Sequence, residues 1–105
     1  MKFIMHYHIR RSPTDDAQNV KLAENLQQAF SAWTPPEGMQ VEQILVQVDG
    51  RGGFAIVETE DEATITMVVS QFQPWFDWDV HLVQDVMQHG VGLGAGTAWA
   101  RETTG

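Results

Sequence analysis

The chain has 105 residues, of which 43% are hydrophobic and 19% charged, so its length and composition are those of one packed globular domain. Fourteen acidic against six basic residues give a net charge of −8, which argues against nucleic acid or an anionic membrane surface as a partner. Because the chain has no cysteine, disulfides, thiolate catalysis and cysteine-ligated metal centres are excluded, and a metal would need histidine, carboxylate or carbonyl ligands.

The first predicted element is a strand over residues 3–9. Its residues alternate between an apolar side, which includes Met5 and Tyr7, and a second side that carries His6 and His8. Ser12 followed by Pro13 is typical of a helix start, so we expect a helix from there to residue 33. Spacings of three and four predict its buried stripe, which is Ala17, Val20, Ala23, Leu26, Phe30 and Trp33.

The next elements complete a recognisable order. Residues 41–48 and 54–59 read as two strands of a hairpin, with residues 49–53 as the turn. The Thr59–Glu62 segment has the capping-box pattern and opens a second helix, which ends before Pro74. Residues 78–83 form the last strand. The order βαββαβ predicts an α+β, ferredoxin-like fold, in which a four-stranded antiparallel sheet carries two helices on one face.

The C-terminal part fits this order less well. We expect a ferredoxin-like domain at 1–86 and a C-terminal tail at 87–105, in which residues 90–96 are a flexible or tightly bent glycine-rich segment. Leu93 and Trp99 would need burial, so the tail is a candidate for an arm that crosses a dimer. No apolar run approaches the ~20 residues of a membrane span and the N-terminus lacks a signal-peptide core, so we expect a cytoplasmic protein.

Four segments carry a resemblance to a known family. They are Met1-Lys2-Phe3, Arg10-Arg11, the block from Gly50 to Asp61, and the strand Phe76-Asp77-Trp78-Asp79-Val80. Over roughly residues 1–86 the chain resembles a family of small bacterial domains of unknown function, placed with the dimeric α+β barrels. The resemblance implies the ferredoxin-like fold and a homodimer, and it implies no particular reaction.

Histidines on one sheet face are the main candidates for chemistry. His6 and His8 are two residues apart, so their side chains leave the same face, opposite the apolar one. In the usual strand order of this fold, His81 and Glu58 stand on the strands beside them. Three imidazoles and a carboxylate would suit zinc, iron, copper or nickel, so His6, His8, His81 and Glu58 form a candidate metal site and catalytic site.

Three interpretations of these residues remain open. The leading one is a small-molecule enzyme whose divalent metal acts as a Lewis acid or activates oxygen or water. The second is a metal-free cyclase, isomerase or monooxygenase in which one histidine is the general base. The third is a non-catalytic ligand-binding or accessory dimer, with polar residues hydrogen-bonded at a wet interface. In the leading interpretation, the pocket of the enzyme would lie between the sheet and the helices or inside a dimer barrel. Separately, we expect a homodimer that buries the open sheet face.

Overall fold

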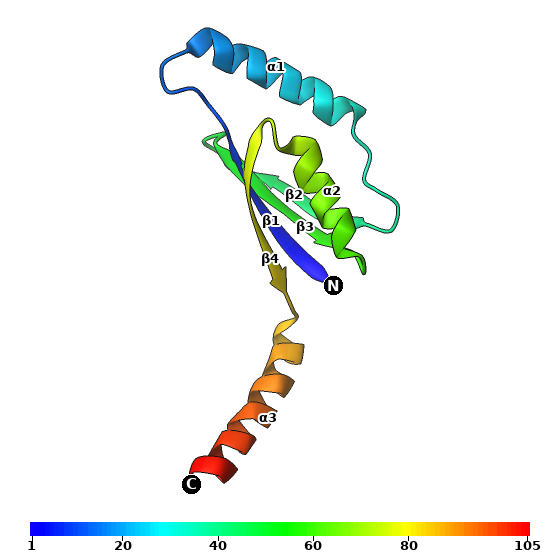
Figure 1. Ribbon diagram of the computed structural model, residues 1–105, viewed down its shortest axis with the longest axis vertical. Coiled ribbons are helices and arrows are strands. Elements are labelled where there is room, and N and C mark those ends of the chain that lie inside the picture. The colour runs from blue at the N-terminus through cyan, green and yellow to red at the C-terminus, as the bar shows by residue number, and fades with distance from the viewer.

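The computed structural model describes residues 1–105 and confirms the α+β fold, with one open sheet of four antiparallel strands in the order β2-β3-β1-β4 (Figure 1). The βαββαβ order is followed by a third helix. The elements are β1 Lys2–Ile9, α1 Asp16–Ala32, β2 Gln40–Val46, β3 Gly52–Glu58, α2 Glu62–Phe72, β4 Phe76–Val83 and α3 Val86–Thr104.

The core lies on the face of the sheet that α2 covers (Figure 1). From β1 it receives Phe3, Met5 and Tyr7, each at most 6% exposed, as the alternation of the strand predicts. Aromatic rings fill its centre: the Phe76 ring stacks on Tyr7 at 4.6 Å between centroids and on Phe72 of α2 at 5.6 Å. This packed layer holds β1 and β4 rigidly side by side, which fixes what their other face presents.

The α2 helix begins two residues later than the capping-box pattern suggests. Asp61 is the N-cap, and its carboxylate accepts the backbone N–H of Ala63 at 2.9 Å. Thr59 is 3% exposed and directly follows β3, where its hydroxyl accepts the N–H of Asp61 at 3.2 Å. The threonine therefore shapes the connection between β3 and α2 and does not cap the helix.

Helix α1 also differs from its prediction in start and in orientation. Its N-cap is Asp15, not Ser12, because the Asp15 carboxylate accepts the N–H of Gln18 at 2.9 Å, while the Ser12 hydroxyl organises the preceding turn. The side chain of Val20 is 60% exposed, so the predicted stripe is wrong in its first half. The less exposed residues of the helix are Asn19, Leu22, Leu26 and Ala29, followed by Trp33 at its end.

The predicted stripe and the observed stripe of α1 both contain Leu26 and Trp33, so helical periodicity alone could not distinguish them. The true stripe passes through Leu22 and starts from Asn19, whose side chain hydrogen-bonds twice to the backbone of Ser12, through its amide oxygen at 2.7 Å and its nitrogen at 2.8 Å. Helix α1 reaches the core only through its second half, where Phe30 lies 5.1 Å from Phe72 between ring centroids.

The turn of the hairpin lies two residues earlier than predicted, at residues 47–51, because β2 ends at Val46 and Gly52 and Gly53 are the first residues of β3. Both are buried, and neither has room for a side chain. A Cβ on Gly53 would overlap the carbonyl oxygen of Leu45 and the ring of Tyr7, and one on Gly52 would overlap the backbone of Tyr7. Glycine here permits a close approach of strands, which sequence patterns do not separate from glycine in a turn.

The glycine-rich segment of the tail is helical, which contradicts the flexible or bent segment expected there. Asp85 caps α3 by accepting the N–H of Met87 at 2.8 Å, and the helix runs through four glycines at positions 90, 92, 94 and 96. Each glycine disfavours a helix by ~1 kcal/mol relative to alanine. None of the residues of α3 is buried. No helix, α3 included, has the length and apolarity to cross a membrane.

Helix α3 leaves the sheet where β4 ends and points away from it (Figure 1). The chain is therefore elongated, with a radius of gyration of 18.6 Å. A compact chain of this length would have a radius of gyration of ~13 Å.

Candidate functional site: a histidine and aspartate cluster

Strand register fixes which side chains share the open face of the sheet. In β1 these are the residues that alternate with the core residues, among them Ile4, His6 and His8. Asp79 of β4 is directly opposite His6, and His81 is directly opposite Ile4. On the other side of β1, Phe54 of β3 is directly opposite His6, and Glu58 is opposite Lys2.

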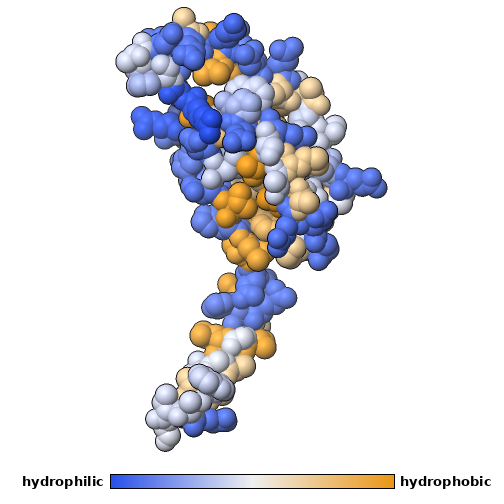
Figure 2. Space-filling view, viewed as in Figure 1, coloured by the Kyte–Doolittle hydropathy of each residue, from blue (hydrophilic) through white to orange (hydrophobic).

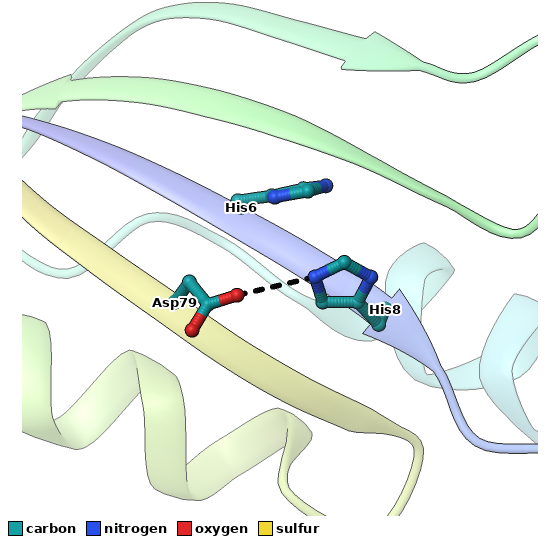
Figure 3. A group of neighbouring side chains, drawn as sticks. All are labelled: His6, His8 and Asp79. Carbon is teal, nitrogen blue, oxygen red and sulfur yellow. Dashed lines mark hydrogen bonds and ion pairs between the residues drawn. The ribbon is translucent and has the colours of Figure 1, made fainter.

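Three of these side chains converge on one point (Figure 3). His6, His8 and Asp79 each offer a ligand atom, and these atoms all lie within 4.8 Å of one another. The His8 Nε2 and Asp79 Oδ2 atoms are 3.2 Å apart, which is a hydrogen bond and, with a protonated imidazole, an ion pair. The imidazole rings of His6 and His8 have centroids 4.0 Å apart.

His6 is the most enclosed member of the cluster. Its ring stacks on Phe54 with 4.2 Å between centroids and 11° between planes, so the cross-strand neighbour fixes the position of the imidazole. The His6 Nε2 atom is buried and has no hydrogen-bond partner. A buried polar atom without a partner costs free energy unless a water molecule, an ion or another bound group satisfies it.

Asp79 is available to the cluster, whereas the neighbouring Asp77 is not. Asp77 is opposite His8 in the register, yet its Oδ1 atom is held by the guanidinium of Arg10, with Nη2 at 2.8 Å and Nε at 2.9 Å. The carboxylate of Asp79 has no basic partner other than His8. The Arg10–Asp77 pair therefore closes one end of the open face and leaves a single carboxylate beside the two imidazoles.

The structure places the four predicted site residues on one face but does not bring all four together. His6 and His8 are in the cluster. His81 is two residues along β4 from Asp79, and Glu58 is opposite Lys2, four residues from His6 in β1. At ~3.3 Å per residue these offsets are ~7 Å and ~13 Å along the strands, so neither side chain belongs to the cluster. Their participation stays a prediction.

Asp79 is the cluster member that sequence reasoning did not single out. The alternation of β4 puts Asp79 on the same side as His81, so the face was predictable. The missing information was the offset between β1 and β4, which makes Asp79 the partner of His6 and moves His81 opposite Ile4. Offset between strands that are distant in sequence depends on the packing of the whole core, and periodicity does not contain it.

The arrangement supports two kinds of chemistry. Two imidazoles and one carboxylate are a recognised donor set for first-row metals, with coordination positions left open. Without a metal, Asp79 would orient the His8 ring through their hydrogen bond, as a carboxylate does for a histidine general base. Both uses need access from outside, which the cluster has: the side chains of His8 and Asp79 are 47% and 62% exposed.

Comparison with known proteins identifies the family and no activity. No curated protein matches the chain. A family described as a domain of unknown function, DUF3303, matches residues 1–96. The match includes the whole sheet, the His6, His8 and Asp79 cluster, and the first half of α3 with its four glycines. Because it spans nearly the entire sequence, the chain belongs to the DUF3303 family.

Proposed function

We propose that His6, His8 and Asp79 bind a divalent transition metal and that the protein is a small-molecule enzyme working on the open face of its sheet. The observation that carries the proposal is the convergence of three ligand atoms within 4.8 Å at an accessible site. The buried, unpartnered Nε2 of His6 supports it, because a bound group would satisfy that atom. Zinc, iron, copper and nickel all suit imidazole and carboxylate donors.

The cluster needs only a small contraction to hold an ion. Ligand atoms at ~2.1 Å from a tetrahedral metal are ~3.4 Å apart, against an upper separation of 4.8 Å here. His6 is fixed by its stacking on Phe54, so His8 and Asp79 would move, and both are exposed enough to change rotamer freely. His6 therefore acts as the rigid member of the site and the other two as adaptable ligands.

A bound metal would supply Lewis-acid chemistry or an activated water molecule. The residues of the chain would contribute position and charge. Phe54 gives the site an apolar wall, and the overall charge of −8 favours a cation over an anion near the surface. His81, on the same face, is within reach of a small molecule bound beside Asp79 and is a candidate general acid or base.

Metal content by mass spectrometry tests the proposal, after the protein is loaded in turn with zinc, iron, copper and nickel. Wild type should hold metal in stoichiometric amounts, and His6→Ala, His8→Ala and Asp79→Asn should each lose most of it. His89→Ala is the matched control, because His89 lies on α3 and hydrogen-bonds to Gln84. His81→Ala and Glu58→Gln show whether the site extends to the two residues outside the cluster.

Two results would contradict the metal site. One is equal, sub-stoichiometric metal in wild type and in His6→Ala. The other is metal that stays bound as the pH falls well below ~6.5, where free imidazole takes up a proton and ceases to be a ligand. If activity toward a small molecule is found and chelators leave it unchanged, the metal-free reading holds, in which Asp79 orients His8 as the general base.

We also propose a homodimer in which a second copy covers the open face. This face carries Ile4, Ile56 and Phe54, which are only partly buried in one chain. Covering these three apolar side chains would remove them from water, which is the usual driving force of such an interface. Light scattering at micromolar concentration should give twice 11.8 kDa, and Ile4→Asp should shift the protein toward monomer. A wild-type monomer that shows no concentration dependence would refute this dimer.

A further inference from the structure

Helix α3 has the surface of a buried helix but is exposed along its whole length. Its large apolar side chains Val91, Leu93 and Trp99 are 76%, 61% and 67% exposed. Hydrophobic residues lie at the surface of α3 just beyond its polar junction with β4 (Figure 2). They point to different sides of the helix, a pattern typical of helices that are enclosed by other parts of a protein.

The solvent-accessible area of the chain is larger than that of a compact monomer. It is 7641 Å², whereas a compact monomer of 11.8 kDa would expose ~5,900 Å². The excess of ~1,700 Å² is about twice the ~800 Å² that each partner buries in a standard interface, and it is in the range of half an obligate homodimer interface. The excess therefore matches in size the area that a second copy of the chain would bury.

The start of α3 directs it away from its own sheet. Only Gln84 and Asp85 separate β4 from α3, and both are engaged: the Asp85 carboxylate accepts the N–H of Met87, and the Gln84 Oε1 atom is 3.0 Å from His89 Nδ1. A connection this short, with both side chains fixed, favours an exchange of the helix between protomers over its return to the same chain.

One side of α3 is suited to meet a copy of itself. Val91, Ala95 and Trp99 are four residues apart and share a face, with Gly92 and Ala98 beside them. Small residues at the centre allow two helix backbones to approach closely. If two α3 helices lie antiparallel about a two-fold axis at Ala95, then Val91 of each faces Trp99 of the other, which places a small side chain against a large one.

Charge favours the antiparallel arrangement over the parallel one. The base of α3 borders an open groove of about 840 Å³ whose lining carries both charges: Lys2 and the N-terminal ammonium of Met1, as well as Glu58, Glu60 and Asp85. The one basic residue of α3 is Arg101, in its last turn. In an antiparallel pair, the last turn of each helix, with Arg101 and Glu102, lies beside the base of the other helix. A parallel pair would put the two Arg101 side chains together and the two Glu102 side chains together, so like charges favour the antiparallel arrangement.

We propose that α3 is an intersubunit element that pairs antiparallel with α3 of a second copy along Val91, Ala95 and Trp99. The pairing needs no metal, and it uses other residues than the proposed covering of the open sheet face, with both contacts joining the same two copies. It also gives Gly92 a role, since a side chain beside this face would hold the two helices apart.

The absence of native cysteine allows a direct test with the full chain. A single Ala95→Cys variant places its thiol on the proposed two-fold axis, where the two Cα atoms can come within the ~4.4–6.8 Å that a disulfide needs. Ala100→Cys is the matched control, because it makes the same substitution on the opposite side of the same helix. Under mild oxidation, Ala95→Cys should form covalent dimers at least about tenfold faster than Ala100→Cys.

A mixture of Val91→Cys and Trp99→Cys chains tests the relative direction of the two helices. Antiparallel helices favour disulfide-linked dimers of one Val91→Cys chain and one Trp99→Cys chain, whereas parallel helices favour dimers of two identical variants. Equal rates for the two alanine variants would overturn the pairing, and self-linked products from the mixture would overturn its direction. A separate measurement distinguishes this pairing from the dimer through the sheet face. If Ala95→Cys fails to cross-link while Ile4→Asp still disrupts a wild-type dimer, the α3 pairing is wrong and the sheet-face dimer stands.

Discussion

The two faces of β1 differ in burial and in contacts, although their residues alternate along the same eight-residue strand. On one face, Met5 and Tyr7 are 1% and 5% exposed and packed against aromatic rings. On the other, His6 is half-buried and His8 is exposed, and their contacts are a stacked ring and a single ion pair. One face thus supplies stability and holds the strands in place, while the other presents side chains that stability does not constrain.

The largest expected effect is on the packed face. Phe76→Ala should lower the free energy of unfolding by ~3–5 kcal/mol, because Phe76 is 2% exposed and its removal leaves a cavity among Tyr7, Phe72 and Trp78. Urea denaturation measures the loss. Phe30→Ala is the control on the same side of the sheet: its ring is 38% exposed, so the cost should be clearly smaller. Equal costs would mean that the packed face has no defined centre.

A second prediction concerns the close approach behind Tyr7. Gly53→Ala should destabilise the protein by ~1–3 kcal/mol, because the new Cβ would overlap the carbonyl of Leu45 and the Tyr7 ring. Gly90→Ala adds the same methyl group in open space on α3, where alanine favours the helix, so its thermal midpoint should stay the same or rise. A neutral Gly53→Ala would show that the β2–β3 pair can move away from β1.

The strands around Gly53 and Asp79 illustrate what the sequence could and could not predict. The alternation of β1 and β4 correctly separated the core residues from the open face, because a period of two depends only on local backbone geometry. It could not distinguish Gly53 in a strand from glycine in a turn, nor Asp79 from His81 as the partner of His6, because both depend on which backbone lies opposite.

The helices also show that local patterns predict some features of the fold and miss others. For α2, Pro74 predicted the end of the helix well, whereas the cap is Asp61 and not Thr59. For α3, four glycines predicted a flexible or bent segment, whereas the cap at Asp85 and the residues between the glycines support a helix. Local propensity is a weak guide where burial against another chain decides the outcome, which is the situation proposed for α3.

A smaller effect is expected from the polar edge of the packed face. Burial raises the pKa of the Tyr7 phenol, whose hydroxyl donates to the carbonyl of Leu45 at 3.3 Å. A raised pKa in the folded state means that stability is complete below the unfolded value of ~10 and falls as the pH rises above it. Because Tyr7 is the only tyrosine, tyrosinate absorbance follows this residue alone, and it should titrate above pH 10 in folded protein and near 10 in urea.

Tyr7→Phe provides the matching variant. It should cost ~1 kcal/mol at neutral pH through the lost hydrogen bond, and it should abolish the alkaline decline that is due to this residue. If tyrosinate forms at the same pH in folded and denatured protein, the phenol is not desolvated, and the packed face is open to water at the β2 edge.

The smallest expected effect on stability belongs to the open face and is the sharpest test of the comparison. Asp79→Asn should change the free energy of unfolding by less than ~0.5 kcal/mol without metal, because its ion pair with His8 is largely exposed. With zinc at about a hundred times its dissociation constant, wild type should gain ~2.7 kcal/mol, since a ligand that binds only the folded state stabilises it. Asp79→Asn should gain far less, and His89→Ala should match wild type. A large loss in metal-free Asp79→Asn would instead place Asp79 among the residues that hold the sheet together, and the division of β1 into a structural face and a functional face would fail.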